Sequence, residues 1–157
     1  MRYIIIIILI AFTIETTLSG ALSDLERHVV ASCVILEAAS EGIDGMRAVL
    51  NVIWNRANHR LDRVFPVVIK PWQFSCMHSI WGKRNPDYNR LIMRAQRDRM
   101  YASAFNLVLV MEKRLLQDNT QGSTFYHTTN ITPYPYWSAH FKHEVTIGSH
   151  VFYSDKK

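Results

Sequence analysis

The spacing of apolar residues changes once along this chain, and that change restricts the fold more than any other feature. From about residue 25 to about residue 116, apolar side chains mostly recur every three or four residues, which is the period of an α-helix. The polar stretch from Asp118 to Gly122 is a predicted turn, and beyond it apolar and polar residues alternate, as in a β-strand. The sequence therefore predicts an α+β fold that is mainly α, with a small β element at its C-terminal end.

The helical part has recognisable start signals. Ser23-Asp24-Leu25-Glu26 has the pattern of a capping box, in which the Ser23 and Glu26 side chains bond each other's backbone amides. The expected helices run from Asp24 to about 40, from an Asp44 cap to about 59, from 86 to 97 after an Asn85 cap, and from 99 to 116 after an Asp98 cap, with one helical turn at 66–69. The helix 99–116 is strongly apolar, so we expect it to be buried centrally.

Three short strands are expected after the turn, at 124–127, 140–146 and 149–153, with Ile147-Gly148 turning the last pair. The sequence contains no internal repeat and no linker composition. One domain over residues 22–157 is therefore predicted.

The first 21 residues have the features of a targeting segment. An apolar run from Tyr3 to Ile14 is shorter than the roughly 20 residues that span a bilayer, and Ser19 and Ala21 are small residues suited to signal peptidase. We expect a signal peptide over residues 1–21, with an uncleaved N-terminal anchor as the alternative. The protein is then exported to the periplasm, cell wall or extracellular space, and contacts a membrane only through this segment.

Charge and cysteine content narrow the partners. Lys and Arg number 18 against 13 Asp and Glu, so the net charge of +5 favours an acidic polymer such as nucleic acid, anionic lipid or bacterial wall. A basic stretch supplies part of this charge and is interpreted first as a solvated face and second as a polymer-binding surface: Arg84, Arg90, Arg94, Arg97 and Arg99. Cys33 and Cys76 allow at most one disulfide, and whether they pair depends on a separation that sequence does not give.

Glu37 is the leading catalytic candidate from its local sequence. Its neighbours Val34, Leu36 and Ala38 are apolar or small, and such surroundings disfavour a charged carboxylate and suit a general acid. The alternative is a carboxylate at a helix end that faces water. Glu41 lies four residues on and would share a helix face with Glu37.

A second group is rich in aromatics and histidines, which can stack on sugars and bond their hydroxyls but can equally form a core. It comprises Phe125, Tyr126, His127, Tyr134, Tyr136, Trp137, His140, Phe141, His143, His150, Phe152 and Tyr153. The histidines lack the spacing of a metal motif. A cysteine nucleophile at Cys33 with a distal histidine is a further alternative, although Cys33 lies on an apolar helix stripe.

These positions together resemble the catalytic domain of SleB-type cell wall hydrolases, the spore-cortex-lytic enzyme family. The likeness covers about residues 25–153 and consists, in order, of Glu37-Ala38-x-x-Glu41-Gly42, Ala48-Val49-x-x-Val52-Ile53-x-Asn55-Arg56, Phe65-Pro66, Gln73-Phe74-Ser75, Asp118-x-Thr120-x-Gly122-Ser123-x-x-x-His127, Pro135-x-Trp137 and Ile147-Gly148-x-His150-x-Phe152-Tyr153. Two features depart from the family pattern: Trp54, where smaller residues are usual, and a longer, more basic segment from Ile80 to Arg99.

The resemblance implies a lysozyme-like fold related to lytic transglycosylases, and cleavage of peptidoglycan between N-acetylmuramic acid and N-acetylglucosamine. It implies that Glu37 is the catalytic acid and base. The expected substrate-binding residues are Glu41, Gln73, His127, Trp137, His150 and Tyr153. Peptidoglycan is then the partner rather than nucleic acid, the enzyme is a monomer, and no cofactor or metal is required. The alternatives are a two-carboxylate muramidase, a cysteine amidase and a non-enzymatic wall-binding module.

Overall fold

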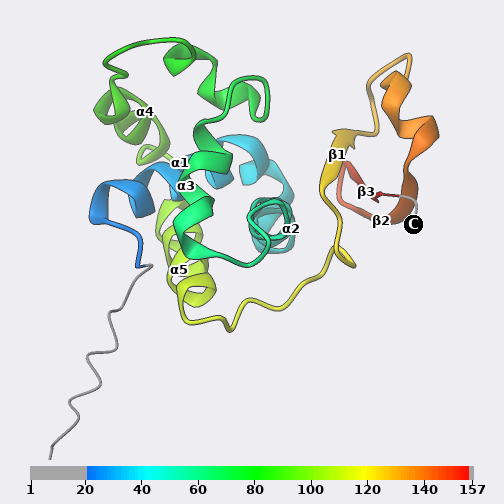
Figure 1. Cartoon of the computed structure of the whole chain (residues 1–157), viewed down its shortest axis with the longest axis horizontal. Coiled ribbons are helices and arrows are strands. Elements are labelled where there is room, and N and C mark those ends of the chain that lie inside the picture. The colour runs from blue at the N-terminus through cyan, green and yellow to red at the C-terminus, as the bar shows by residue number, and fades with distance from the viewer. Residues whose placement is uncertain (1–20, 156–157) are drawn as a thin grey trace, which may run out of the picture.

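The structure is a computed structural model that describes residues 21–155. The helices are α1 (Asp24–Ala38), α2 (Gly42–Arg56), α3 (Leu61–Ile69), α4 (Tyr88–Ala95) and α5 (Tyr101–Glu112), with short 3-10 helices η1 (Ala39–Glu41), η2 (Ser75–Ile80) and η3 (Tyr136–His140). The strands are β1 (Phe125–Thr128), β2 (Lys142–Ile147) and β3 (His150–Ser154). The expected α+β fold is confirmed (Figure 1). The signal segment lies outside the described residues except for Ala21, and within 21–155 no helix is long and apolar enough to cross a membrane.

Helix α1 is the centre of the helical body. The capping box is present, because the Ser23 side chain accepts from the Glu26 amide and the Glu26 carboxylate accepts from the Ser23 amide. α1 packs against α2, α3, α4 and α5, and buries most of its length from Val29 to Ile35. The prediction of a central α5 was wrong: α5 buries only Ala104, Val108 and Met111, all on the face toward its neighbours.

Four helix starts differ from the sequence expectation. α5 begins at Tyr101 with no side-chain cap, because Asp98 accepts a hydrogen bond from the Met100 amide just before the helix. Asp87 caps α4 by accepting a hydrogen bond from the Arg90 amide, so this helix begins after Asp87 instead of after Asn85. α2 begins at Gly42 with no side-chain cap, which places Asp44 inside its first turn. α3 extends over nine residues around Pro66, because Val64 and Val68 are both buried and hold it against the core.

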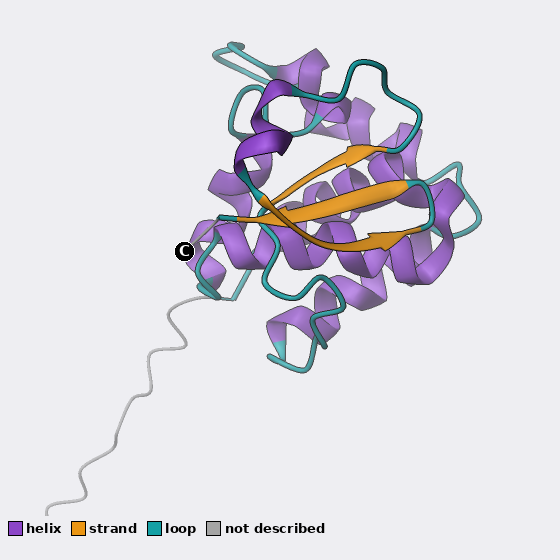
Figure 2. Ribbon diagram, turned by 90° about the vertical axis from the view of Figure 1, so that its right-hand side faces the viewer, coloured by secondary structure: helices purple, strands orange, loops and turns teal. Residues whose placement is uncertain are grey.

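The three strands form an antiparallel sheet in the order β1-β3-β2 that lies across one side of the helices (Figure 2). Tyr126 pairs with Phe152, and His127 pairs with Val151. Because side chains alternate along a strand, Tyr126, His150 and Phe152 share the inner face, toward the helices. Phe152 packs there on Ala48 and Val52 of α2 and forms a small second core.

The outer face of the sheet is covered by its own connection. His127 stacks on Tyr153 there, and Trp137 meets both rings edge to face, with ring centroids 5.3 to 5.7 Å apart. Trp137 belongs to η3, which lies between β1 and β2 in the chain. The sheet therefore has an aromatic layer on its outer side and the helical body on its inner side.

Candidate active site

Glu37 lies in the last turn of α1, half-buried, where three elements meet. Its Oε1 accepts hydrogen bonds from the Ser75 hydroxyl at 3.0 Å and the Cys76 amide at 2.9 Å. Its Oε2 accepts one from the Tyr126 hydroxyl at 2.9 Å. The carboxylate is thus held by η2 on one side and by β1 on the other.

The two η2 donors are fixed by the buried residues around them. Phe74 is almost fully buried, and its carbonyl accepts the Met77 amide that starts η2. Cys76 is buried against Cys33 of α1. Ser75, between them, is exposed, so the Glu37 carboxylate is reached from solvent on this side.

Tyr126 contacts the candidate catalytic carboxylate, and the sequence did not single it out from its aromatic neighbours. Burial raises the pKa of its hydroxyl well above the usual 10.0, and the nearby Glu37 carboxylate raises it further. The hydroxyl therefore stays neutral and can donate to Glu37. The alternation of residues 125–128 was the signal that could have placed Tyr126 on the face opposite to His127.

Arg56, at the end of α2, ties the elements around the site together. Its Nε donates to the Thr124 carbonyl at 2.6 Å, just before β1. Its guanidinium carbon lies 5.3 Å from the centroid of Phe74 and 5.5 Å from that of Phe125, which are cation–π distances. Burial lowers the pKa of Arg56, although it stays charged at any ordinary pH.

Glu41 turns away from Glu37 toward the sheet. Its Oε1 accepts from the Ser149 hydroxyl at 2.6 Å and its Oε2 from the Ser149 amide at 2.7 Å. The hydrogen bond from the Ser149 side chain and that from its amide lower the pKa of Glu41 below its usual 4.5. A Cβ at Gly148 would overlap Oε2, and a Cβ at Gly45 would overlap the Glu41 side chain, so both glycines leave room for this contact.

His150 lies on the inner face beside Tyr126, with ring centroids 5.2 Å apart. Burial lowers the pKa of His150, and the nearby Glu41 and Glu37 carboxylates oppose this. Its Nδ1 is buried and has no hydrogen-bond partner within residues 21–155. His150 is therefore the one predicted histidine that the structure places near both carboxylates.

The other predicted residues form no hydrogen bond with Glu37 within residues 21–155. On the outer face, His127 bonds the Thr128 carbonyl at 2.9 Å and the Tyr153 hydroxyl at 3.0 Å, and Trp137 packs on both rings. Gln73 lines a hollow of about 350 Å³ together with Arg56 and Phe125. Glu37 and Gln73 are linked through the chain, since Ser75 follows two residues after Gln73.

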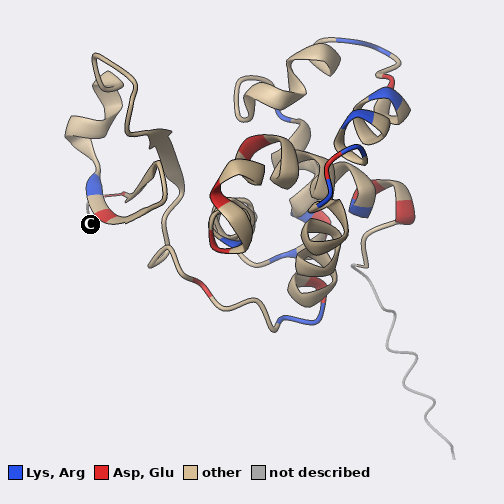
Figure 3. Cartoon of the chain, turned by 180° about the vertical axis from the view of Figure 1, so that it is seen from behind, with Lys and Arg blue, Asp and Glu red and all other residues tan. Residues whose placement is uncertain are grey.

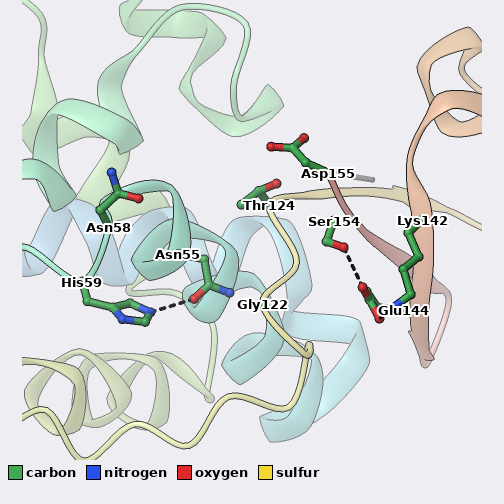
Figure 4. Close-up of a pocket in the computed structure, with 9 residues that line it drawn as sticks. All are labelled: Asn55, Asn58, His59, Gly122, Thr124, Lys142, Glu144, Ser154 and Asp155. Carbon is green, nitrogen blue, oxygen red and sulfur yellow. Dashed lines mark hydrogen bonds and ion pairs between the residues drawn. The ribbon is translucent and has the colours of Figure 1, made fainter. Parts of the chain in front are cut away.

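A larger cavity of about 660 Å³ does not coincide with Glu37. It lies between the end of α2 and the strands β2 and β3 (Figure 4). Asn55 and His59 line one wall and are hydrogen-bonded to each other at 2.9 Å. Glu144 and Ser154 line the other wall and are hydrogen-bonded to each other at 2.6 Å. None of the predicted site residues lines this cavity.

The fold defines the class of protein first. The lysozyme-like fold that the resemblance implies is confirmed, because the structure matches those of two SleB catalytic domains. The catalytic domain of Bacillus cereus SleB has this fold at 21% identity with a TM-score of 0.56, over 85% of this chain and 93% of that one. The catalytic domain of the germination-specific lytic transglycosylase SleB from Bacillus anthracis matches at 21% identity and a TM-score of 0.57, over 85% and 98%.

The family follows from the sequence itself. Residues 40–153 match the family described as Cell Wall Hydrolase, and this chain therefore belongs to the cell wall hydrolase family and is an enzyme. The resemblance to SleB-type enzymes is thereby confirmed. The matched range begins three residues after Glu37 and does not include it. No curated protein matches the sequence.

Proposed function

We propose that this enzyme cleaves the glycan strands of peptidoglycan between N-acetylmuramic acid and N-acetylglucosamine, as a lytic transglycosylase with Glu37 as acid and base. The observation that carries the proposal is the orientation of the two carboxylates: Glu37 is held by Ser75, Cys76 and Tyr126, whereas Glu41 is bonded to Ser149. A hydrolase needs two carboxyl groups across the scissile bond, and a transglycosylase needs one. The structural neighbour from Bacillus anthracis is itself a lytic transglycosylase, which supports the same activity here.

In the proposed reaction, protonated Glu37 gives its proton to the glycosidic oxygen as the bond from that oxygen to the anomeric carbon breaks. The C6 hydroxyl of the muramic acid attacks the anomeric carbon, and its proton passes to the Glu37 carboxylate. The products are a 1,6-anhydro ring and a free hydroxyl on the leaving sugar. No water is consumed, and Glu37 returns to its protonated form.

The hydrogen bonds around Glu37 indicate which oxygen carries the transferable proton. Oε1 accepts two hydrogen bonds, from Ser75 and Cys76, which occupy both of its lone pairs. Oε2 accepts only one, from Tyr126. We therefore assign the proton to Oε2 and assign Tyr126 the role of orienting it.

The remaining predicted residues are assigned by their surroundings. We propose that Glu41 is a positioning residue, because both oxygens of its carboxylate accept hydrogen bonds from Ser149. Gln73 is proposed to contact substrate from its hollow beside Phe125, and His150 to line the site as a neutral ring. For His127, Trp137 and Tyr153 a sugar contact remains a prediction, and their packing favours support of the sheet.

The products of the reaction provide the test. Purified peptidoglycan is digested, and the released muropeptides are analysed by mass spectrometry. The proposal expects non-reducing 1,6-anhydro-muramic ends and only a partial loss of activity for Glu41→Gln. Mainly reducing ends, together with a Glu41→Gln variant as inactive as Glu37→Gln, would instead identify a two-carboxylate muramidase.

We further propose that the enzyme acts outside the cytoplasm as a monomer. The cell wall family supports an extracellular or wall location. Cleavage after Ala21 is tested by N-terminal sequencing of the protein recovered from the producing cells. Retention of the intact N-terminus in a membrane fraction would indicate an anchor instead.

A further inference from the structure

Two thiols meet in the core directly beside the Glu37 contact. The Sγ atoms of Cys33 and Cys76 lie 3.8 Å apart, and the Cys76 Sγ is 3.9 Å from the Cys33 carbonyl oxygen. Cys33 is fully buried and Cys76 is 6% exposed. Cys33 belongs to α1 and Cys76 to η2, so the pair joins two elements that are 43 residues apart in the sequence.

The position of this pair connects it with the site. Cys33 lies one helical turn before Glu37, and the Cys76 amide donates to Glu37 Oε1 at 2.9 Å. Any bond between the sulfurs would therefore fasten η2 to α1 beside the hydrogen bond that holds the carboxylate. Cys33 is not placed as a nucleophile, because burial raises its pKa well above its usual 9.0.

We propose that Cys33 and Cys76 form an intramolecular disulfide when a small-molecule disulfide donor is present as the protein folds. Sulfurs 3.8 Å apart are in van der Waals contact, and a bond of about 2.05 Å requires an approach of roughly 2 Å shared between two side chains. One thiolate attacks the donor and releases one donor thiol. The second thiolate attacks the resulting mixed disulfide and releases the other, so the protein loses two protons and two electrons to the donor.

The timing follows from burial. In the folded protein the two thiols are enclosed and Cys33 is held in its protonated form, so exchange with a donor is slow. During folding both are accessible, and packing of η2 on α1 brings them together. The disulfide closes a long loop and so restricts the unfolded chain, which stabilises the fold.

The experiment refolds the full chain in a mixture of reduced and oxidised glutathione. Intact mass is measured, followed by iodoacetamide labelling in denaturant with and without prior reduction. The proposal expects a mass lower by two hydrogens, no label before reduction and two labels after it. Two free thiols, glutathione adducts or cross-linked dimers as the main product would overturn it.

Stability provides the second readout. The oxidised protein is expected to unfold at a temperature about 5–10 °C above that of the reduced protein. Cys33→Ala and Cys76→Ala, which cannot close the bond, serve as controls whose unfolding temperature is expected to be unchanged by reductant. An equal unfolding temperature for both forms of the wild type would overturn the stabilising role. Both readouts are independent of peptidoglycan cleavage, so they succeed or fail separately from the proposed function.

Discussion

Glu37 and Glu41 are four residues apart, yet their carboxylates bind different parts of the sheet. Glu37 accepts from Tyr126 of β1, and Glu41 accepts twice from Ser149 in the turn between β2 and β3. The region between the end of α1 and the start of α2 is thus hydrogen-bonded to the sheet through both Glu37 and Glu41. Only Glu37 also accepts a hydrogen bond from η2. The two carboxylates are therefore expected to differ sharply when each is changed.

Glu37→Gln is expected to lower the rate of peptidoglycan cleavage by about 10² or more while leaving the fold intact. The amide keeps the size of the side chain and can still accept from Ser75 and Cys76, but it has no proton to transfer. Turbidity of purified walls and circular dichroism measure the two effects. Asp62→Asn, an exposed change on α3, is the control. A rate within a few fold of wild type would place the acid at another residue.

Tyr126→Phe is expected to lower kcat by about 10- to 100-fold with a smaller effect on KM. The change removes one hydrogen bond to a carboxylate, which is worth about 1.5–3 kcal/mol, but retains the ring against Phe152. Steady-state kinetics on soluble glycan fragments give the two constants. Tyr88→Phe, a half-buried tyrosine of α4, provides the comparison. If both variants behave alike, the Tyr126 hydroxyl does not orient Glu37.

Gly148→Ala is expected to destabilise the protein more than Gly122→Ala. Both glycines have a positive φ, of 57° and 79°, so both substitutions incur the left-handed strain of about 1–2 kcal/mol. Only the Cβ at position 148 meets Glu41, and that overlap adds about 1–3 kcal/mol. Urea unfolding measures the difference. Equal losses would mean that Glu41 can move aside without cost.

Acid is expected to weaken the fold through Glu41. Its pKa in the fold is below the usual 4.5, so its contribution to stability is present above that pH and is lost as the pH falls through the lowered pKa. The free energy of unfolding is measured between about pH 6 and pH 3. Glu41→Gln and Ser149→Ala should each flatten this dependence, because the first removes the carboxylate and the second removes the hydrogen bond that the Ser149 hydroxyl donates to it. An unchanged slope in Glu41→Gln would assign the acid sensitivity to other groups.

Salt is expected to weaken binding to the wall. Arg90 and Arg94 on α4 and Arg97 just after it are exposed, and they form no ion pair among the described residues. Basic residues gather in this region (Figure 3). Charges separated by more than about 8 Å are screened at physiological ionic strength. The double variant Arg90→Gln/Arg94→Gln should bind walls several-fold less tightly at low salt. Sedimentation with walls measures this binding. The control is the double variant Arg63→Gln/Lys113→Gln, which has the same change in net charge elsewhere on the surface. Equal binding by the two variants would show that α4 is only a solvated face.

Local patterns predicted the elements well and their packing less well. The capping box fixed the start of α1, and the alternation of residues 124–153 located all three strands to within two residues. The prediction of which helix lies at the centre of the fold was wrong, because apolar content does not show how many neighbours surround a helix. α5 is apolar almost throughout, but α1, with Arg27 and His28 in its sequence, packs against four helices.

The site was also predicted only in part, because local sequence patterns do not show contacts between distant segments of the chain. Apolar neighbours in the sequence singled out Glu37, but in the structure its carboxylate accepts hydrogen bonds from three polar groups instead of lying in an apolar pocket. Ser75 and Tyr126 come from distant parts of the chain, and no local signal connects them with α1. Grouping His127, Tyr153 and His150 together overlooked the alternation within strands, which puts the first two on one face and the third on the other.

The small core formed by Phe152 with Ala48 and Val52 affects how easily the sheet opens locally away from the helices. Few apolar contacts hold the sheet, so its amides should exchange with deuterium through local opening, well before those of α1 exchange by global unfolding. Each such opening would carry Tyr126 away from Glu37 while the helical body stays folded. The enzyme would then lose its arranged carboxylate at temperatures where most of its secondary structure is still present.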